Sequence, residues 1–456
     1  YSGAACTGQQ NVFMGSGAGQ SVTSCDTSVV IGYQAAGLGV MTGNSNTVIG
    51  NTAGLDLTSG YSNTFIGSGA GANVTTGFKN IAIGQGAIVT GTDMDYNIAI
   101  GYDAIGNGGV SGDNNIGIGL ETGNAITSGA SNTIIGHQAG VAVTEGDKNV
   151  CLGYQTGNSI TSGDMNIAIG HETTLSSVVT GDNNVAIGPG CLYANTSGSH
   201  NVAIGTSGLT AHSSGDDNIG IGYLAGYSGG GTGSDCVYIG PNAGKNGGQP
   251  TDGDANTAIG ASAMSGALST GKWNLMLGVA GMNALSTGDN NIGIGYTAGN
   301  TGSPGGQVTT GDNGIFLGDE NITEANIQVD WTIASDKRDK TDVNPMDLGL
   351  EFINQLEPVT YRWDKRSKYS DDQSAIPDGT HKEEQLEGGF LAQDVESLEE
   401  QYGHKFSDKT NLTFHLSEDE KMYGIKYGKF VPMLVKAVQE LSAEVEELKE
   451  KLNGSN

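Results

Sequence analysis

Residues 335–340 of this chain, Ser-Asp-Lys-Arg-Asp-Lys, place one hydroxyl group among charged side chains that could activate it. A serine becomes a nucleophile when a neighbouring base takes its proton, and a neutral lysine amine can be that base. Lys337 and Lys340 are both candidates, although Asp336 and Asp339 would favour the protonated form of a lysine unless they point away. On spacing alone, an ordinary serine in a charged linker explains these residues better.

A second set of side chains that could do chemistry is a row of aspartates, each directly after a glycine: Asp113, Asp147, Asp164, Asp182, Asp216 and Asp289. If successive repeats stack as coils, such carboxylates lie about 5 Å apart and could share Ca²⁺. The GGxGxD phrase of calcium-binding β-rolls is absent, however. We therefore expect turn hydrogen bonds and solubility rather than a metal site, and we expect no cofactor.

The elements that carry these aspartates are internal repeats of the phrase Asn-x-x-Ile-Gly, as in residues 46–50 and 166–170. Eighteen copies, mostly 17 or 18 residues apart, end at the glycines at positions 15, 32, 50, 67, 84, 101, 119, 136, 153, 170, 188, 205, 222, 240, 260, 278, 295 and 318. The leading Asn is present in fifteen copies and is replaced by Ser28, Cys236 and Gly314 in the others. Because so short a unit cannot bury an apolar face alone, stacked copies must share one core.

Each phrase reads as a short strand in which two large apolar residues flank a small one, as Ile98 and Ile100 flank Ala99. The pattern predicts a mainly β fold: a parallel β-solenoid shaft over residues 1–320, with about 18 coils of 17–18 residues and a ladder of Asn side chains. At about 4.8 Å per coil the shaft would be roughly 85 Å long. The large pair shares one face, and the small residue would suit close approach of another chain; the alternative is a tolerated solvent-facing position.

The overall composition excludes several classes of protein. Of the residues, 77 are glycine, with 8 prolines and no Gly-X-Y period, so collagen is excluded. The net charge is −29, and residues 1–334 hold four cations, Lys79, Lys148, Lys245 and Lys272, which argues against nucleic acid as a partner.

No apolar run is long enough for membrane insertion. The five cysteines, Cys6, Cys25, Cys151, Cys191 and Cys236, are too scattered for a disulfide framework or a zinc site. Since the chain begins at Tyr1, we expect it to be a processed or partial product.

The composition changes after about residue 320, because residues 335–456 hold 16 of the 20 cations and 8 of the 77 glycines. We expect a linker at 321–334, a compact α+β domain at 335–429 with an exposed excursion at 364–388 and a helix from Gly388 to about Gln401, and a coiled-coil helix at 430–456. The final helix has an a/d seam formed by Leu434, Val438, Leu441, Val445, Leu448 and Leu452. The alternative is an amphipathic helix that faces the core of its own chain.

Four ordered motifs in this region resemble a known family: 334–340 (ASDKRDK), 356–363 (LEPVTYRW), 389–395 (GFLAQDV) and 427–441. They are similar to the C-terminal intramolecular chaperone of phage endosialidases and tail fibres. The resemblance implies a homotrimer whose tail helps the β-structured region to fold and then cuts itself off. It also implies that Ser335 attacks the carbonyl of Ala334 with Lys340 as the base, since the family's lysine lies five residues after its serine. The repeats themselves resemble the heads of trimeric autotransporter adhesins and the shafts of phage tail fibres.

These features together favour a fibre of a phage-like particle, located in the virion. Its expected partners are two further copies of the chain, other tail proteins, and a receptor or glycan on the host surface. The enzymatic activity expected is a single-turnover serine endopeptidase that cuts its own chain between Ala334 and Ser335. One alternative is a polysaccharide-degrading tailspike, which would need a pair of carboxylates in a groove. Another is an extracellular adhesin on a cell surface.

Overall fold

The computed structural model describes residues 6–106, 108–173, 179–227, 231–246, 253–266, 269–329, 331–370 and 373–454. The chain divides into two compact units, with the boundary between Ile292 and Gly293. Each unit is described by itself below.

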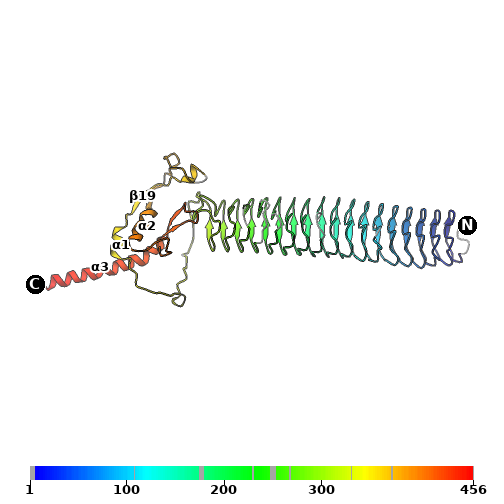
Figure 1. The fold of residues 1–456 in the computed structure, drawn as a ribbon, viewed down its shortest axis with the longest axis horizontal. Coiled ribbons are helices and arrows are strands. Elements are labelled where there is room, and N and C mark those ends of the chain that lie inside the picture. The colour runs from blue at the N-terminus through cyan, green and yellow to red at the C-terminus, as the bar shows by residue number, and fades with distance from the viewer. Residues whose placement is uncertain are drawn as a thin grey trace. The chain divides into compact units, whose positions relative to one another are not determined.

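Within the residues described, the repeats form eighteen strands of three residues each, which belong to one parallel sheet. The strands are β1 Val12–Met14, β2 Val29–Ile31, β3 Thr47–Ile49, β4 Thr64–Ile66, β5 Ile81–Ile83, β6 Ile98–Ile100, β7 Ile116–Ile118, β8 Thr133–Ile135, β9 Val150–Leu152, β10 Ile167–Ile169, β11 Val185–Ile187, β12 Val202–Ile204, β13 Ile219–Ile221, β14 Val237–Ile239, β15 Thr257–Ile259, β16 Leu275–Leu277, β17 Ile292–Ile294 and β18 Ile315–Leu317. Figure 1 shows the strands of the first unit stacked coil upon coil. The predicted parallel β-solenoid is confirmed.

Successive coils of the solenoid stack in exact sequence register. Strands β5 and β6 pair Ile81 with Ile98 and Ala82 with Ala99. Like residues therefore form continuous columns along the stack, which is how units of 17 or 18 residues bury a shared core.

The direction in which the strand residues face corrects our expectation from the sequence. In β2–β17 the middle residue of each strand is buried inside its own coil, as Ala99 and Ala168 are. The flanking residues are half-buried or exposed and point outward. The small residue is thus neither a contact for another chain nor solvent-facing: a coil this narrow encloses one strand side chain per turn, together with alanines and aliphatic residues such as Ala53 and Leu57. We call the outward first and third residues of β2–β17 the strand-face stripe.

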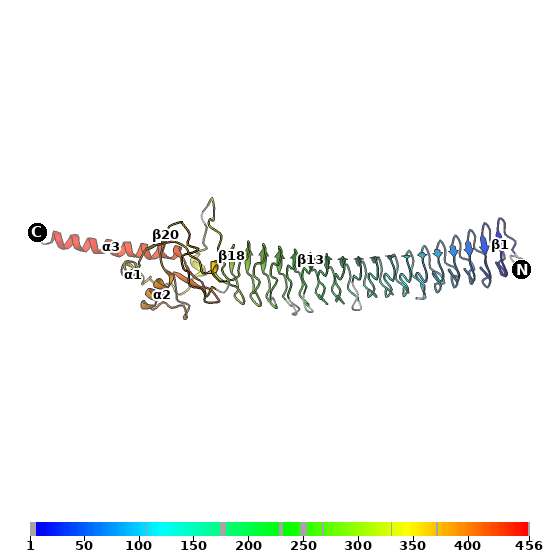
Figure 2. The ribbon, with the colours of Figure 1, turned by 90° about the horizontal axis from the view of Figure 1, so that it is seen from above.

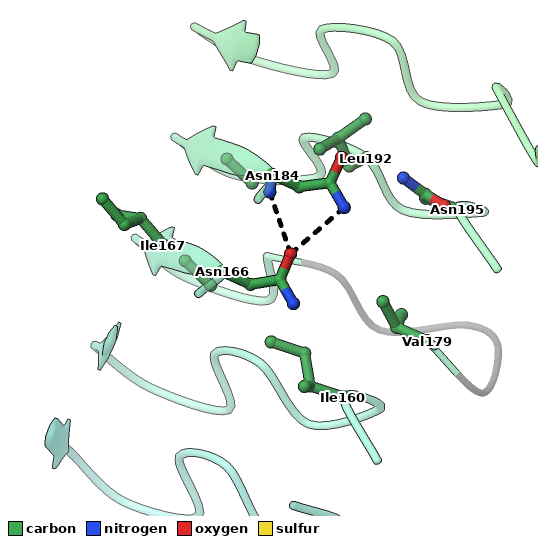
Figure 3. A pocket seen from close by; sticks show the side chains of 9 residues that line it. Ile160, Asn166, Ile167, Val179, Asn184, Leu192 and Asn195 are labelled. Carbon is green, nitrogen blue, oxygen red and sulfur yellow. Dashed lines mark hydrogen bonds between the residues drawn. The ribbon is translucent and has the colours of Figure 1, made fainter. Parts of the chain in front are cut away.

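The predicted ladder of Asn side chains is present, and it joins coil to coil. The Asn166 carboxamide oxygen accepts the backbone N–H of Asn184 at 3.0 Å and its side-chain amide at 3.1 Å (Figure 3). The Asn166 side-chain amide in turn donates to the carbonyl of Gly181 in the following coil at 2.9 Å. One coil earlier, the Asn149 carboxamide oxygen accepts the backbone N–H of Asn166 at 2.9 Å, and the Asn149 side-chain amide donates to the carbonyl of Gly163 at 2.8 Å. These buried amides are hydrogen-bonded, so their burial carries little penalty.

The closing glycine of each phrase is required by the stacking distance. Gly101 has a φ of +138°, and a Cβ there would lie 2.1 Å from the carbonyl oxygen of Gly119 in the next coil. Only glycine combines this backbone conformation with such close approach. The closing positions account for 18 of the 77 glycines.

The second unit contains the last coil and the C-terminal region. The elements of this region are η1 Lys337–Asp339, α1 Leu350–Gln355, β19 Val359–Tyr361, η2 Arg366–Lys368, β20 Glu387–Gly389, α2 Ala392–Gln401, β21 Phe414–Leu416, β22 Tyr423–Ile425, η3 Tyr427–Lys429 and α3 Phe430–Asn453. Strands β19 and β20 pair antiparallel, as do β21 and β22. Gly388 and Gly389 belong to β20, and not to the helix predicted from Gly388, because Gly389 pairs with Val359 on β19. None of the helices described is long and apolar enough to cross a bilayer.

A small core joins α1, α2 and the first turns of α3 (Figure 2). It is formed by Leu348, Phe352, Val395, Leu398, Phe430 and Met433. Glu440 on α3 accepts the backbone N–H of Leu350 at 2.6 Å and so caps the start of α1. The six residues of the predicted a/d seam, however, are between 40 and 72% exposed. Beyond its first turns, α3 is therefore not the core-facing amphipathic helix that was the alternative expectation.

Candidate autoprocessing site

The short helix η1 brings Ser335 and Lys340 together. The Lys340 Nζ lies 2.5 Å from the Ser335 Oγ, within hydrogen-bonding distance. The backbone turns through Lys337–Asp339 between them, and the N–H of Lys340 donates to the carbonyl of Lys337. This hydrogen bond pairs Ser335 with the lysine that the family resemblance implied, rather than with Lys337, the other candidate.

An ion pair organises the start of this helix. The Asp336 carboxylate accepts the backbone N–H of Arg338 at 2.9 Å and contacts the Arg338 guanidinium at 2.6 Å. These hydrogen bonds, first from the Arg338 side chain and then from its backbone, lower the pKa of Asp336. Asp336 thereby serves as the N-cap of η1, and its negative charge is engaged by Arg338.

The dyad is open to solvent in the single chain. Ala334, Ser335 and Lys340 are all exposed. A lysine that acts as a general base must first lose its proton, and burial is the main influence that favours the neutral amine. The geometry of a nucleophile and a base is therefore present in one chain, whereas a water-excluded environment is not.

The segment directly before the dyad is unusually apolar for an exposed one. Ile327, Val329, Trp331 and Ile333 alternate with other residues and are between 51 and 82% exposed. Alternation at period two is typical of a strand with one apolar face. This face is uncovered in the single chain.

The predicted Gly-Asp turns lie where stacking places them, and their carboxylates have a structural role. The Asp147 carboxylate accepts the backbone N–H of Ala130 in the preceding coil at 2.7 Å, and Asp164 accepts that of Asp147 at the same distance. The hydrogen bonds that we expected at these turns are confirmed. Among the described residues, no three His, Cys, Asp or Glu side chains are grouped so as to hold a metal ion.

The shaft contains a small internal cavity near β10 and β11. It has a volume of about 10 Å³ and is lined in part by Ile160, Asn166 and Leu192 (Figure 3). This space is at the lower limit for a single water molecule. It cannot admit a polysaccharide, so it lends no support to the tailspike-hydrolase alternative.

Sequence reasoning missed Glu418, which lies in the turn between β21 and β22 and accepts five hydrogen bonds from residues 309–311. Glu399 was missed too: it is buried on α2 and accepts the backbone N–H groups of Leu412 and Thr413 at 2.8 Å. Each contact joins segments separated along the chain, and neither glutamate stands in a motif that could have signalled it.

Part of this C-terminal region matches a known protein family. Residues 335–404 match the family model described as chaperone of endosialidase. The match begins at Ser335 itself and ends after α2, so it covers three of the four motifs noted in the sequence. No curated protein matches the chain.

Proposed function

We propose that this chain, a β-solenoid that ends in a chaperone domain of the endosialidase type, is the trimeric fibre protein of a phage-like particle. In this proposal the shaft binds a receptor or glycan on the host surface, and other tail proteins hold the fibre on the virion. The observation that carries the proposal is the union of the two parts in one chain: a repetitive shaft with parallel coils, and a folding domain attached directly after it.

Two uncovered apolar surfaces support a homotrimer. The strand-face stripe runs along the shaft as columns made mostly of Ile, Val and Leu, such as Ile98 and Ile100, that are half-buried or exposed in the single chain. Thr47, Thr64, Thr133 and Thr257 interrupt the first column. The a/d seam of α3 is a second uncovered apolar surface. Contiguous apolar surface of this kind is rare on soluble monomers, and association of three chains would cover both surfaces.

The proposed cut follows from the position of Ser335. Its Oγ attacks the carbonyl carbon of Ala334 while Lys340 accepts the hydroxyl proton. As the new C–O bond forms, the C–N bond between Ala334 and Ser335 breaks, and the released amine takes a proton. Water then hydrolyses the ester, which leaves a carboxylate on Ala334 and a free amine on Ser335.

Assembly would supply what the exposed dyad lacks. Packing of three copies of the apolar segment 327–333 against one another would place the adjacent Ser335 and Lys340 in a drier environment. Burial would then favour the neutral lysine. A cut that waits for assembly would also keep the chaperone attached until the shaft has folded.

The test of the trimer is a mass measurement on the full chain. Light scattering should give three times the 46.4 kDa of one chain. Ile100→Asp on the strand-face stripe and Leu441→Asp on the seam should each lower the trimer fraction, whereas Glu450→Gln, on the face of α3 opposite the seam, should not. A stable monomer of the unaltered chain would reject the proposal.

The test of the cut is N-terminal sequencing. The unaltered protein should yield a fragment that begins at Ser335, and Ser335→Ala should remain one intact chain. Cleavage that persists in Ser335→Ala, or a fragment that begins elsewhere, would exclude Ser335 as the nucleophile.

A further inference from the structure

Each turn of the shaft depends on the next coil for its hydrogen-bond acceptor. In one inner coil the backbone N–H groups of Thr144, Glu145 and Gly146 all donate to a single atom, the carbonyl oxygen of Thr161, at 3.0 to 3.2 Å. The Thr144 hydroxyl donates to the same oxygen at 3.1 Å. The turn at 75–77 repeats the pattern toward the carbonyl of Thr92. The last coil has no following coil to supply this oxygen.

At the last coil, the side chain of Glu418 accepts the hydrogen bonds that the carbonyl oxygen of a following coil accepts elsewhere. The equivalent turn is Thr309-Thr310-Gly311, and its N–H groups donate to the Glu418 carboxylate at 3.1, 2.9 and 3.0 Å. The Thr309 hydroxyl donates to it at 2.8 Å, and the Thr310 hydroxyl also donates to it. The four donors that an inner turn directs at one carbonyl oxygen are thus directed at one carboxylate.

The hairpin of β21 and β22 holds Glu418 in place. Across its turn, the Ser417 N–H donates to the carbonyl of Met422, and the Met422 N–H donates to the Ser417 hydroxyl at 2.9 Å. The hairpin also lies very close to the last coil: a Cβ on Gly306, whose φ is +78°, would lie 2.5 Å from the Cβ of Ser417. The fit of hairpin to coil is therefore close enough to require glycine on the coil side.

The contact with the last coil favours the ionised form of Glu418. Partial desolvation alone would raise the pKa of Glu418, but the hydrogen bonds from Thr310 and Thr309 outweigh it and lower the pKa to about 2. A carboxylate that accepts several N–H and O–H groups forms stronger hydrogen bonds than a neutral carbonyl. The nearest comparison is an N-cap, in which a side-chain oxygen satisfies backbone N–H groups that the regular structure leaves over.

Two lysines form further hydrogen bonds between residues that precede the proposed cleavage site and residues that follow it. The Lys365 Nζ donates to the backbone carbonyl of Glu320 at 2.5 Å, and Lys368 donates to the side chain of Asn321. In these contacts and in those of Glu418, one partner precedes the Ala334–Ser335 bond and the other follows it. Hydrolysis of that bond would break none of them.

We propose that the β21–β22 turn is a docking surface for the open end of the solenoid, on which Glu418 replaces the carbonyl oxygen of a missing nineteenth coil. The surface fixes the last coil in register, so that the remaining coils have a formed template on which to stack. Where the chain is cut, a step that rests on the proposed function, the same surface keeps the tail attached without a covalent bond.

Hydrogen–deuterium exchange on the full chain tests the cap. The chain carries Ser335→Ala so that the result does not depend on cutting. Glu418→Gln should speed exchange of the amides of Thr309–Gly311 roughly ten-fold or more, while the inner turn at 144–146 stays unchanged. Glu420→Gln, in the same hairpin turn, is the matched control and should leave both turns protected. Equal exchange at 309–311 in the Glu418→Gln and control chains would overturn the proposal.

A second variant keeps the test valid if Glu418→Gln impairs folding. Thr309→Val removes the hydroxyl donor that corresponds to that of Thr144 and leaves the hairpin intact, and it should speed exchange of the same amides by a smaller factor. No change in this variant would overturn the one-to-one replacement described above.

A second experiment tests whether the docking surface holds the tail on the shaft after the backbone has been cut. In the Ser335→Ala chain, a specific protease site placed within the exposed segment 322–329 allows the backbone to be cut at will. The two fragments should co-elute in size-exclusion chromatography with Glu418 present and separate in Glu418→Gln. Separation of the unaltered fragments would refute the docking role, whatever the outcome for autoprocessing.

Discussion

His212 is a buried titratable side chain of the shaft whose ionisation the fold opposes. It stands seven residues after a closing glycine, where other coils carry Leu57, Val74 or Val143. Burial lowers its pKa from 6.5 to about 4, and the backbone of Gly226 offsets only part of that effect. The fold therefore holds this imidazole neutral.

This leads to a pH dependence of known sign. Because the folded pKa lies below the unfolded value, His212 costs the fold nothing above pH 6.5, and stability falls as the pH drops from 6.5 toward 4. The loss should reach roughly 3 kcal/mol near pH 4. Thermal unfolding at pH 7.5 and pH 4.5 should show that His212→Leu reduces the acid destabilisation, whereas His200→Asn, at an exposed histidine, should not. An unchanged pH profile in His212→Leu would contradict the assignment.

Lys340 allows a sharp test of its role as the base. Lys340→Arg keeps the positive charge and the reach, but a guanidinium does not lose its proton in proteins. Autoprocessing should therefore stop in Lys340→Arg and continue in Lys337→Arg, as judged by the fraction of chain cut after a fixed time. The reverse result would identify Lys337 as the base.

At the scale of the coil, the closing glycine is the most demanding position. Gly101→Ala would place a side chain 2.1 Å from the Gly119 carbonyl oxygen at a φ of +138°. We expect a loss of about 2 kcal/mol or more, since both strain and a steric clash oppose it. The unfolding midpoint should fall accordingly. Gly69→Asn is the control: a Cβ at Gly69 meets nothing within 4 Å, and asparagine tolerates its φ of +71°.

The strands also show which structural features the sequence can reveal. The phrase from Asn166 to Gly170 predicts a strand, a buried amide and a glycine turn, because each signal is local and recurs in every coil. Periodicity places Ile167 and Ile169 on one face, but it does not say whether that face is inside or outside. The answer depends on how much space the coil encloses, which is a property of the closed turn.

The same distinction applies to the C-terminal region. The spacing of Ser335 and Lys340 could be noticed in the sequence because both residues lie in one short turn, and their catalytic role stays a prediction. Glu418 could not be found in this way, because its partners at 309–311 lie more than 100 residues earlier. Only the end of the solenoid, where no following coil supplies a carbonyl oxygen to the turn at 309–311, explains why a carboxylate is needed there.

At the scale of the whole molecule, the shaft should depend on its tail in order to fold. Parallel coils pair residues that are 17 or 18 apart, so chain entropy is lost before pairing compensates for it. Residues 1–334 expressed alone should aggregate or stay unfolded, whereas the full chain with Ser335→Ala should be soluble. Sedimentation and circular dichroism distinguish the outcomes. If residues 1–334 form a soluble trimer as readily as the full chain, the chaperone role is excluded.

The hydrogen bonds between coils have a mechanical consequence. They connect one coil to the next, as the bond from Asn184 to Asn166 does, so a pull along the stack loads them one coil at a time. Each coil that peels off releases 17 or 18 residues, or about 60 Å of extended chain. Single-molecule stretching should therefore give a regular sawtooth of force against extension. A shaft of this kind lengthens in small steps under tension and dissipates work at each step, where a rigid rod would break.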